Sequence, residues 1–146
     1  ITVLFKRPKL NWLANIVLSG RRHSQVHLAE ANLHGVKQLM QALKKGEAIG
    51  VLPDQVPNEG QGVWAQFFNT PAYTMTLVSK LAESSNATVL IGFGHRLTRG
   101  RGYDVYIEPL GQDHSPQGIN DRLEMLIRKY PTQYLWNYQR FKKPNK

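Results

Sequence analysis

A helix that leads directly into a short apolar strand, residues 33–52, constrains the fold of this chain more than any other feature. Between residues 33 and 43 the apolar side chains recur with the period of a helix. The Lys-Lys-Gly sequence at 44–46 then favours a helix C-terminus. The apolar run 48–52 predicts a buried strand, because Pro53 ends it and cannot donate a ladder hydrogen bond. A helix joined to a buried strand in this way is typical of α/β folds.

The rest of the chain carries similar signals for strands and helices. Apolar runs predict the strands, and capping pairs such as Thr70-Pro71 and Ser115-Pro116 predict helix starts. The order β-α-α-β-α-β-β-α indicates an α/β fold, a mixed sheet with flanking helices, in a single domain over residues 1–146. The expected strands are 1–6, 48–52, 87–94 and 104–107, and the expected helices are 10–18, 33–43, 70–82 and 116–130.

Composition and charge narrow the class of protein. The 146 residues include no cysteine, which excludes a disulfide framework, a thiolate nucleophile and a cysteine-based zinc site. The net charge is +9, with eight bases and one acid in residues 1–45 and seven bases and two acids in residues 120–146. Basic ends favour an anionic partner such as nucleic acid, phospholipid headgroups or an acidic carrier protein. No apolar run is long enough for a membrane span, and the start at Ile1 in mid-strand indicates part of a longer protein.

Several polar residues come directly after predicted strands. Asp54, followed by Gln55, lies where open α/β sheets place ligand sites. It is either a turn residue that accepts backbone hydrogen bonds or an acid that orients a substrate or a basic side chain. Arg7 and Arg96 also follow apolar strands, so we expect them to share one sheet edge with Asp54. Guanidinium groups suit phosphate oxygens, and the alternative is a solvated basic face. The candidate phosphate ligands are Arg7, Arg21, Arg22 and Arg96.

Aromatic and basic residues interleave in the C-terminal tail, residues 134–142. Such a segment stacks nucleobases, sits at a membrane interface or packs onto the core, and core packing is the commonest of the three. No nucleophile elbow, phosphate-binding loop or dinucleotide fingerprint occurs. The five histidines lack the clustering of a metal site, so the sequence predicts no metal.

Several short motifs, in order over nearly the whole chain, carry a family resemblance. The most specific is the run Pro131–Trp136 followed by Arg140-Phe141-Lys142. Together the motifs resemble the bacterial lipid A biosynthesis acyltransferases, the late lauroyl and myristoyl acyltransferases of lipopolysaccharide assembly. The other matching segments are Leu43–Glu47, Leu52–Gln55, Phe67–Asn69, Ala72–Thr74, Arg96 and Tyr103.

The chain departs from that family at three places. Asn69 stands where the family usually has glycine, and Ile91-Gly92 replaces a proline-containing strand end. The family's catalytic motif, a histidine followed five positions later by Asp or Glu, does not occur. In related enzymes it lies upstream of the segment that matches residues 1–7, so we expect this chain alone to be inactive. The residues five positions after the histidines are Leu28, Asn32, Leu39, Gly100 and Ile119.

The resemblance implies a partial glycerolipid-acyltransferase-like fold, the C-terminal portion of a larger acyltransferase. The implied reaction moves a fatty acyl chain from acyl carrier protein to a hydroxyl of a lipid A precursor, with the upstream histidine as general base. The resemblance implies no cofactor. It also implies a location on the cytoplasmic face of the bacterial inner membrane, and the apolar helix expected over 10–18 suits the bilayer interface. Asp54 matches the acid that organises the site. The implied substrate-binding residues are Arg7, Arg21, Arg22, Gln55 and Arg96.

Three alternatives stay open from the sequence. In the first alternative the protein is an acyltransferase that acts on another phospholipid or glycolipid, although the Pro131–Trp136 run favours the lipid A branch. The second is a basic nucleic-acid-binding module, which the charge of +9 and the aromatic tail would suit. No recognisable RNA or DNA motif occurs, so we expect no nucleic-acid partner. The third is a non-catalytic paralogue kept for binding or scaffolding.

Overall fold

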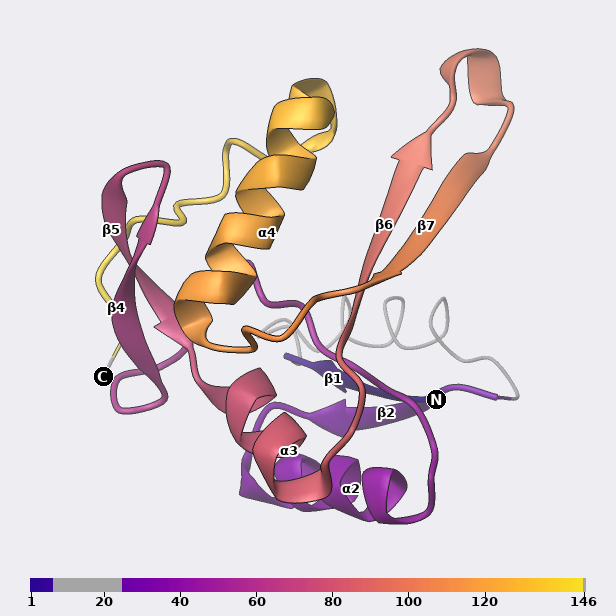
Figure 1. Ribbon diagram of the computed structural model, residues 1–146, viewed down its shortest axis with the longest axis vertical. Coiled ribbons are helices and arrows are strands. Elements are labelled where there is room, and N and C mark those ends of the chain that lie inside the picture. The colour runs from indigo at the N-terminus through magenta and orange to yellow at the C-terminus, as the bar shows by residue number, and fades with distance from the viewer. Residues whose placement is uncertain (7–24, 146) are drawn as a thin grey trace, which may run out of the picture. The chain divides into compact units, whose positions relative to one another are not determined.

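The computed structural model describes residues 1–6 and 25–145. The chain divides into a first unit over residues 1–52 and a second unit over residues 53–146. Figure 1 follows it from the indigo N-terminus to the yellow C-terminus. The helix expected over 10–18 lies outside the described residues. The single domain over residues 1–146 stays a prediction.

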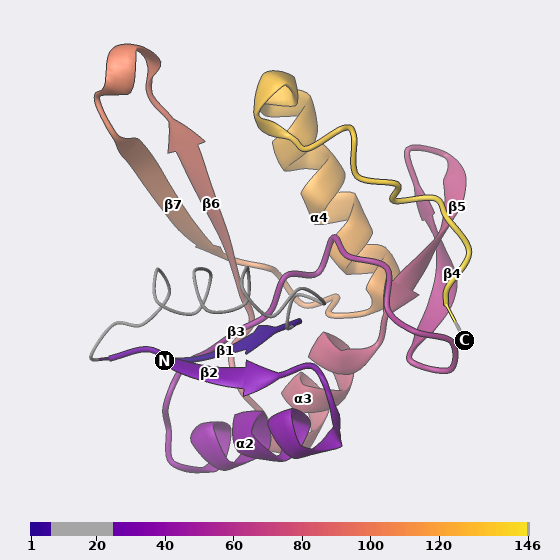
Figure 2. The ribbon, with the colours of Figure 1, turned by 180° about the vertical axis from the view of Figure 1, so that it is seen from behind.

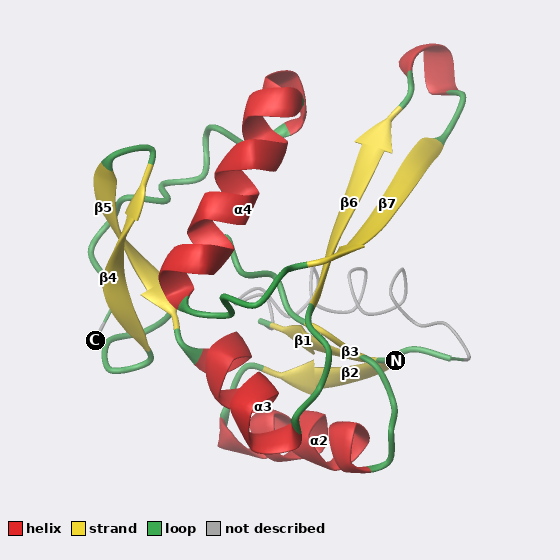
Figure 3. Ribbon diagram, in the orientation of Figure 1, coloured by secondary structure: helices red, strands yellow, loops and turns green. Residues whose placement is uncertain are grey.

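Three short parallel strands form the sheet of the first unit. β1 (Thr2–Phe5) lies between β2 (His27–Glu30) and β3 (Ile49–Gly50), in the order β2-β1-β3. Figure 3 shows these strands in yellow. The strands predicted at 1–6 and 48–52 are confirmed, the second in shortened form. The sequence did not indicate β2, because its two apolar residues between polar ones make too short a run to recognise.

Helix α2 (Leu33–Lys44) covers the segment predicted to be helical and packs against all three strands. Asn32 caps it, since its Oδ1 accepts the backbone N–H of Gly35 at 2.9 Å. A Cβ atom on Gly35 would lie 1.8 Å from the carbonyl oxygen of Glu30, so only glycine lets the helix approach the end of β2 this closely. The buried apolar side chains of this unit are Phe5, Ala29, Leu39 and Ala42.

The second unit contains a hairpin where the sequence predicts a helix. β4 (Gly62–Phe67) and β5 (Thr70–Met75) pair antiparallel across a two-residue turn. Phe68 and Asn69 form that turn with φ angles of 50° and 57°. Two consecutive left-handed residues make a turn whose twist matches the twist of a hairpin. The helix predicted over 70–82 is therefore wrong over its first half.

The Thr-Pro pair at 70–71 looks like a helix cap, but here it begins a strand. Pro71 stands opposite Gln66, whose backbone N–H and C=O bond the side chain of Gln117 at 2.8 and 3.2 Å. The missing N–H of the proline therefore removes no ladder bond from β5, which is the condition under which strands tolerate proline. Helix α3 begins only after the hairpin and spans Leu77–Ser85.

A second hairpin and a longer helix complete the unit. The predicted strands at 87–94 and 104–107 are found as β6 and β7, which pair antiparallel, and the predicted last helix is α4. Ser115 caps α4 as expected, because its Oγ accepts the backbone N–H of Gly118 at 3.1 Å. The bounds are β6 Leu90–Arg96, η1 Thr98–Gly100, β7 Tyr103–Pro109, α4 Pro116–Lys129 and η2 Pro131–Gln133.

The core of the second unit lies between α4 and the β4–β5 hairpin. The backbone N–H of Phe68 donates to Glu124 Oε1 at 2.6 Å, which joins the hairpin turn to the helix. Figure 2 shows α4 beside this hairpin, with the yellow C-terminal tail passing along both. The buried residues are Phe67, Ala72 and Ile127, and Phe68, Leu123 and Tyr134 pack against them.

The α/β class is confirmed, while the strands are distributed over small separate sheets. Parallel pairing occurs in β2-β1-β3 and antiparallel pairing in the two hairpins. The expectation that Arg96 shares a sheet edge with Arg7 and Asp54 is wrong for Arg96, because β6 pairs only with β7 among the described strands. β1 and β3 are parallel, but Arg7 itself lies outside the described residues.

The turn residue Asn69 gives a test of the β4–β5 hairpin. Glycine adopts a positive φ without steric cost, so Asn69→Gly should leave the free energy of unfolding within about 0.5 kcal/mol of the parent. Asn69→Ala should lower it by about 1 kcal/mol, because a Cβ without a local polar group is disfavoured in the left-handed region. Chemical denaturation of both variants measures the difference. Equal stability of the two would contradict the turn geometry.

Candidate functional site

Asp54 and Gln55 lie in the turn that follows β3 (Ile49–Gly50) after Val51 and Leu52, as the sequence predicts. Asp54 is half-buried and Gln55 is exposed. If Asp54 were a turn residue, its carboxylate would accept backbone N–H groups, and no described residue donates a hydrogen bond to it. The described hydrogen bonds therefore leave this carboxylate available to a substrate or to a basic side chain.

The C-terminal tail anchors the backbone next to this turn. The N–H of Val56 donates to the hydroxyl of Tyr138 at 2.9 Å, a contact between residues 82 positions apart. Further along, the N–H of Glu59 donates to the carbonyl of Asn145, also at 2.9 Å. Tyr138 of the tail and Asn145 beyond the tail thus hold the segment after Asp54 at two points.

The tail itself packs onto the core only in part. Tyr134 lies against Phe67, with ring centroids 6.4 Å apart, which agrees with the core packing favoured from the sequence. Leu135 and Trp136 are 64% and 57% exposed, so the middle of the tail faces solvent. The indole N–H of Trp136 donates to the carbonyl of Pro131 at 2.7 Å and fixes the ring against the tail's own backbone.

Arg140 is the most deeply buried residue of the tail, with 2% of its surface exposed. Its Nη1 donates to the carbonyl of Tyr73 at 2.9 Å. Its Nη2 donates to Thr74 Oγ1 at 2.8 Å and to Asn120 Oδ1 at 3.2 Å. Thr74 and Asn120 are fully buried and also bond each other, at 3.0 Å. One guanidinium therefore joins the tail to β5 and α4.

This buried cation has no carboxylate partner among the described residues. Burial lowers the pKa of Arg140, because removing the guanidinium from water disfavours its charged form, and interactions with Tyr134, Tyr138 and Asp54 act against that effect. Burial likewise raises the pKa of Tyr134, and the negative charge of Asp54 raises it further. Asp54 is thus the acid whose charge acts on this part of the tail.

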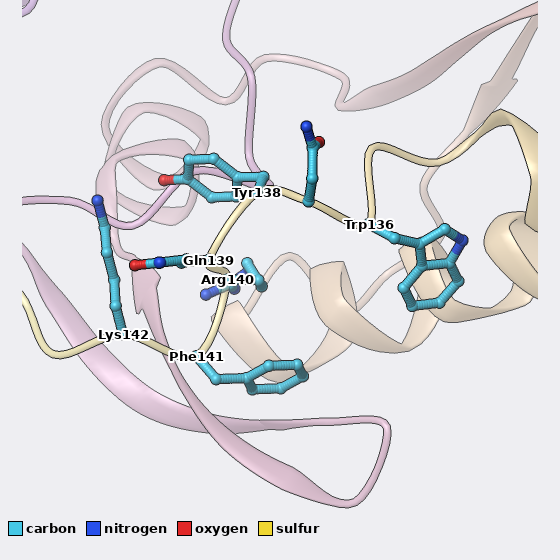
Figure 4. Close-up of a pocket in the computed structure, with 7 residues that line it drawn as sticks. Trp136, Tyr138, Gln139, Arg140, Phe141 and Lys142 are labelled. Carbon is cyan, nitrogen blue, oxygen red and sulfur yellow. The ribbon is translucent and has the colours of Figure 1, made fainter.

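A shallow, open hollow of about 400 Å³ runs along the tail and is lined by residues 136–142. Figure 4 shows Trp136 and Tyr138 pointing to opposite sides of the tail. The ammonium of Lys142 lies 5.6 Å from the ring centroid of Tyr138. The hollow thus offers the Lys142 ammonium and several aromatic rings to an approaching group.

Arg96 ends β6, and its backbone is held by the side chain of Gln133. The N–H of Arg96 donates to Gln133 Oε1 and its carbonyl accepts from Gln133 Nε2, both at 3.3 Å. Its exposed guanidinium bonds no described residue. The other three candidate arginines, Arg7, Arg21 and Arg22, lie outside the described residues, so their phosphate-binding role stays a prediction.

Comparison with known proteins identifies the family. A family model described as bacterial lipid A biosynthesis acyltransferase matches residues 1–143. The chain belongs to this family. The Gln133 that holds Arg96 and the Arg140 that joins tail, hairpin and helix are both part of the C-terminal motif Pro131–Lys142 that carries the resemblance.

Named relatives of this acyltransferase-family chain cover it almost fully. A lipid A biosynthesis acyltransferase of Haemophilus influenzae is 28% identical over 142 residues, 92% of this chain and 42% of the relative. The lipid A biosynthesis palmitoleoyltransferase of Escherichia coli is 30% identical over 148 residues, 93% of this chain and 46% of the relative. The lipid A biosynthesis lauroyltransferase of the same species is 27% identical over 143 residues, covering 92% and 45%. The chain spans less than half the length of these relatives.

Sequence reasoning did not find the buried polar group of this family chain, Arg140 with Thr74 and Asn120. A basic residue among aromatic ones is exposed in most proteins, and the three residues lie far apart along the chain. At position 69, where the family usually has glycine, Asn69 adopts the positive φ that the turn requires. The only signal for Arg140 was its place in the C-terminal motif.

The hydrogen bonds that the two Nη atoms of Arg140 donate can be tested by their effect on the free energy of unfolding. Arg140→Lys keeps the charge but cannot reach all three oxygens, so it should lower the free energy of unfolding by about 2 kcal/mol at pH 7. Burial without a carboxylate lowers the pKa of a lysine in the folded state. At alkaline pH the unfolded state of the variant therefore binds more protons than the folded state. The free energy of unfolding of the variant should thus rise between about pH 8 and 10.

The matched control is Arg128→Lys, at a side chain that is 64% exposed and 3.4 Å from Glu124. It should change stability by less than about 0.5 kcal/mol at either pH. Denaturant titrations at the two pH values measure both variants. An Arg140→Lys variant as stable as the parent would mean that the three contacts of Arg140 contribute little.

Proposed function

We propose that the protein to which this chain belongs transfers a fatty acyl group from acyl carrier protein to a hydroxyl of a lipid A precursor. The observation that carries the proposal is the family match over residues 1–143. The relatives bear the names lipid A biosynthesis acyltransferase, palmitoleoyltransferase and lauroyltransferase. In this proposal the chain is the C-terminal portion of a larger acyltransferase.

The reaction is an exchange of one carbonyl substituent for another. The acceptor hydroxyl loses its proton to a general base and its oxygen attacks the thioester carbonyl. A C–O bond forms, the C–S bond breaks, and the proton passes to the departing thiolate of the carrier. The family resemblance assigns the base to a histidine upstream of this chain, so residues 1–146 supply binding and orientation in place of proton transfer.

The residues of this chain would contribute charge at the acceptor. The Asp54 carboxylate is half-buried and free of described hydrogen-bond donors, which suits a group that orients a cationic side chain or the upstream histidine. Arg7, Arg21, Arg22 and Arg96 would bind phosphate oxygens of the acceptor, with Gln55 as a neutral hydrogen-bonding group beside Asp54.

The charge of the chain supports the proposed partners. Both an acidic carrier protein and a phosphorylated glycolipid favour a surface with the net charge of +9 found here. A basic protein is also attracted to the anionic inner face of the bacterial membrane, where we place the reaction. Among residues 1–6 and 25–145, no helix is both long enough and apolar enough to cross a bilayer.

Acceptor profiling with the full-length protein tests the function. Incubation with an acyl-carrier thioester should acylate a lipid A precursor, and should leave glycerol phosphate and phosphatidylinositol mannosides unmodified. Mass spectrometry of the lipid fraction detects the product. Preferential acylation of one of the other two acceptors would move the protein to another branch of lipid acylation.

The isolated chain should show no transfer. It contains no histidine with an acid five positions later, so residues 1–146 lack the expected general base. The measurement is release of thiol from the acyl-carrier thioester in the presence of a lipid A precursor, with full-length protein as the positive control. Transfer above a protein-free blank would show that a base within these residues had been overlooked.

Asp54→Asn in the full-length protein separates the two interpretations of this residue. If its charge orients a group at the acceptor, kcat/KM should fall about tenfold or more, which corresponds to about 1.4 kcal/mol, while the fold survives. If it is a turn residue, asparagine should keep both activity and stability within about 0.5 kcal/mol. Steady-state kinetics and a thermal melt on one preparation decide between them. Asp104→Asn, at an exposed acid on β7, is the control and should change neither.

A further inference from the structure

We propose that the C-terminal tail positions the Asp54 turn, with the Tyr138 hydroxyl fixing the backbone of the turn and the buried Arg140 guanidinium holding the tail on β5 and α4. This inference rests on the proposed function, because it assigns the tail a role in the same site. It adds two positioning residues, neither of which was a candidate from sequence.

The turn has few contacts of its own. Among the described residues, the backbone from Pro53 to Pro57 makes one hydrogen bond, from the N–H of Val56 to the Tyr138 hydroxyl. A short segment with one hydrogen-bonded anchor takes its position from that anchor. Since Asp54 is two residues from Val56, moving the anchor moves the carboxylate.

Arg140 holds the tail in place. Its three hydrogen-bond acceptors are a carbonyl, a hydroxyl and an amide oxygen, all neutral, so they stabilise the guanidinium without cancelling its charge. Its Nε is buried and has no hydrogen-bond partner. Arg140 is two residues from Tyr138, so the bonds that hold Arg140 also fix the place of the Tyr138 hydroxyl.

Arg140 acts on the site only through the tail. It is 2% exposed, and both of its Nη atoms are engaged by β5 and α4. Tyr138 is half-buried, and its hydroxyl is engaged with Val56. Both are therefore positioning residues, and their loss should lower kcat by displacing Asp54 while KM for the acyl-carrier thioester changes little.

Tyr138→Phe in the full-length protein tests the proposal, because it removes the hydroxyl and keeps the ring. The matched control is Tyr134→Phe, in the same tail, whose hydroxyl is buried and has no hydrogen-bond partner. Hydrogen exchange of peptides that cover residues 53–58 should become roughly tenfold faster in Tyr138→Phe. It should be unchanged in Tyr134→Phe. The value of kcat should fall about fivefold in the first variant and stay at the parental value in the second.

A double variant distinguishes positioning from general destabilisation. If Tyr138 acts through Asp54, then adding Tyr138→Phe to Asp54→Asn should lower kcat no further, because the carboxylate it positions is already gone. Two independent losses would instead multiply. Multiplying losses, or unchanged exchange at residues 53–58 in Tyr138→Phe, would overturn the proposal and leave the acyl transfer itself intact.

The remaining outcomes separate this inference from the proposed function. Faster exchange with unchanged kcat would overturn the catalytic role of the tail. Faster exchange in a full-length protein that transfers no acyl group would overturn the proposed function, while supporting the tail as the anchor of the turn.

Discussion

The second unit depends on the burial of one guanidinium group. Arg140 holds a strand carbonyl, a strand hydroxyl and a helix amide at once, and it lies over the ring of Phe67 at 5.3 Å. Without it the Tyr73 carbonyl and the Asn120 amide oxygen would be buried acceptors with no donor from the tail, which proteins rarely tolerate. One side chain of the tail therefore joins the β4–β5 hairpin to α4.

The same contact explains why much of an aromatic tail remains open to solvent. Arg140 and Tyr134 fix the tail at two points, so the residues between them need not pack in order to hold it. Trp136 lies between them and is 57% exposed. Phe141, directly after Arg140, is 46% exposed although its ring lies 6.0 Å from that of Phe67. Exposed rings beside a lysine form the hollow, and they leave the hydroxyl of Tyr138 free to bond the segment after Asp54.

Local signals in the sequence predicted the elements that local interactions specify. α2 and α4 were found because Asn32 and Ser115 cap them and their apolar residues share one face. The β4–β5 hairpin was missed because Thr70-Pro71 has the composition of a helix start, and only the positive φ of Phe68 and Asn69 reveals the turn. Strand pairing and burial are non-local, so neither the separate β6–β7 sheet nor the position of Arg140 could be read from neighbouring residues. The place of Asp54 after β3 was predictable because a strand ended by proline is itself a local signal.

A buried cation without a carboxylate partner is a poor way to stabilise a fold. Apolar residues of similar volume often replace buried ions with no loss of stability, because they avoid the cost of removing a charge from water. Selection for stability alone would therefore favour an apolar anchor with an uncharged partner at β5 and α4. The guanidinium becomes advantageous when its several donors join elements that one apolar side chain could not, and here it bonds β5 and α4 at once. The tail that it holds also carries the Tyr138 hydroxyl, which bonds the segment after Asp54.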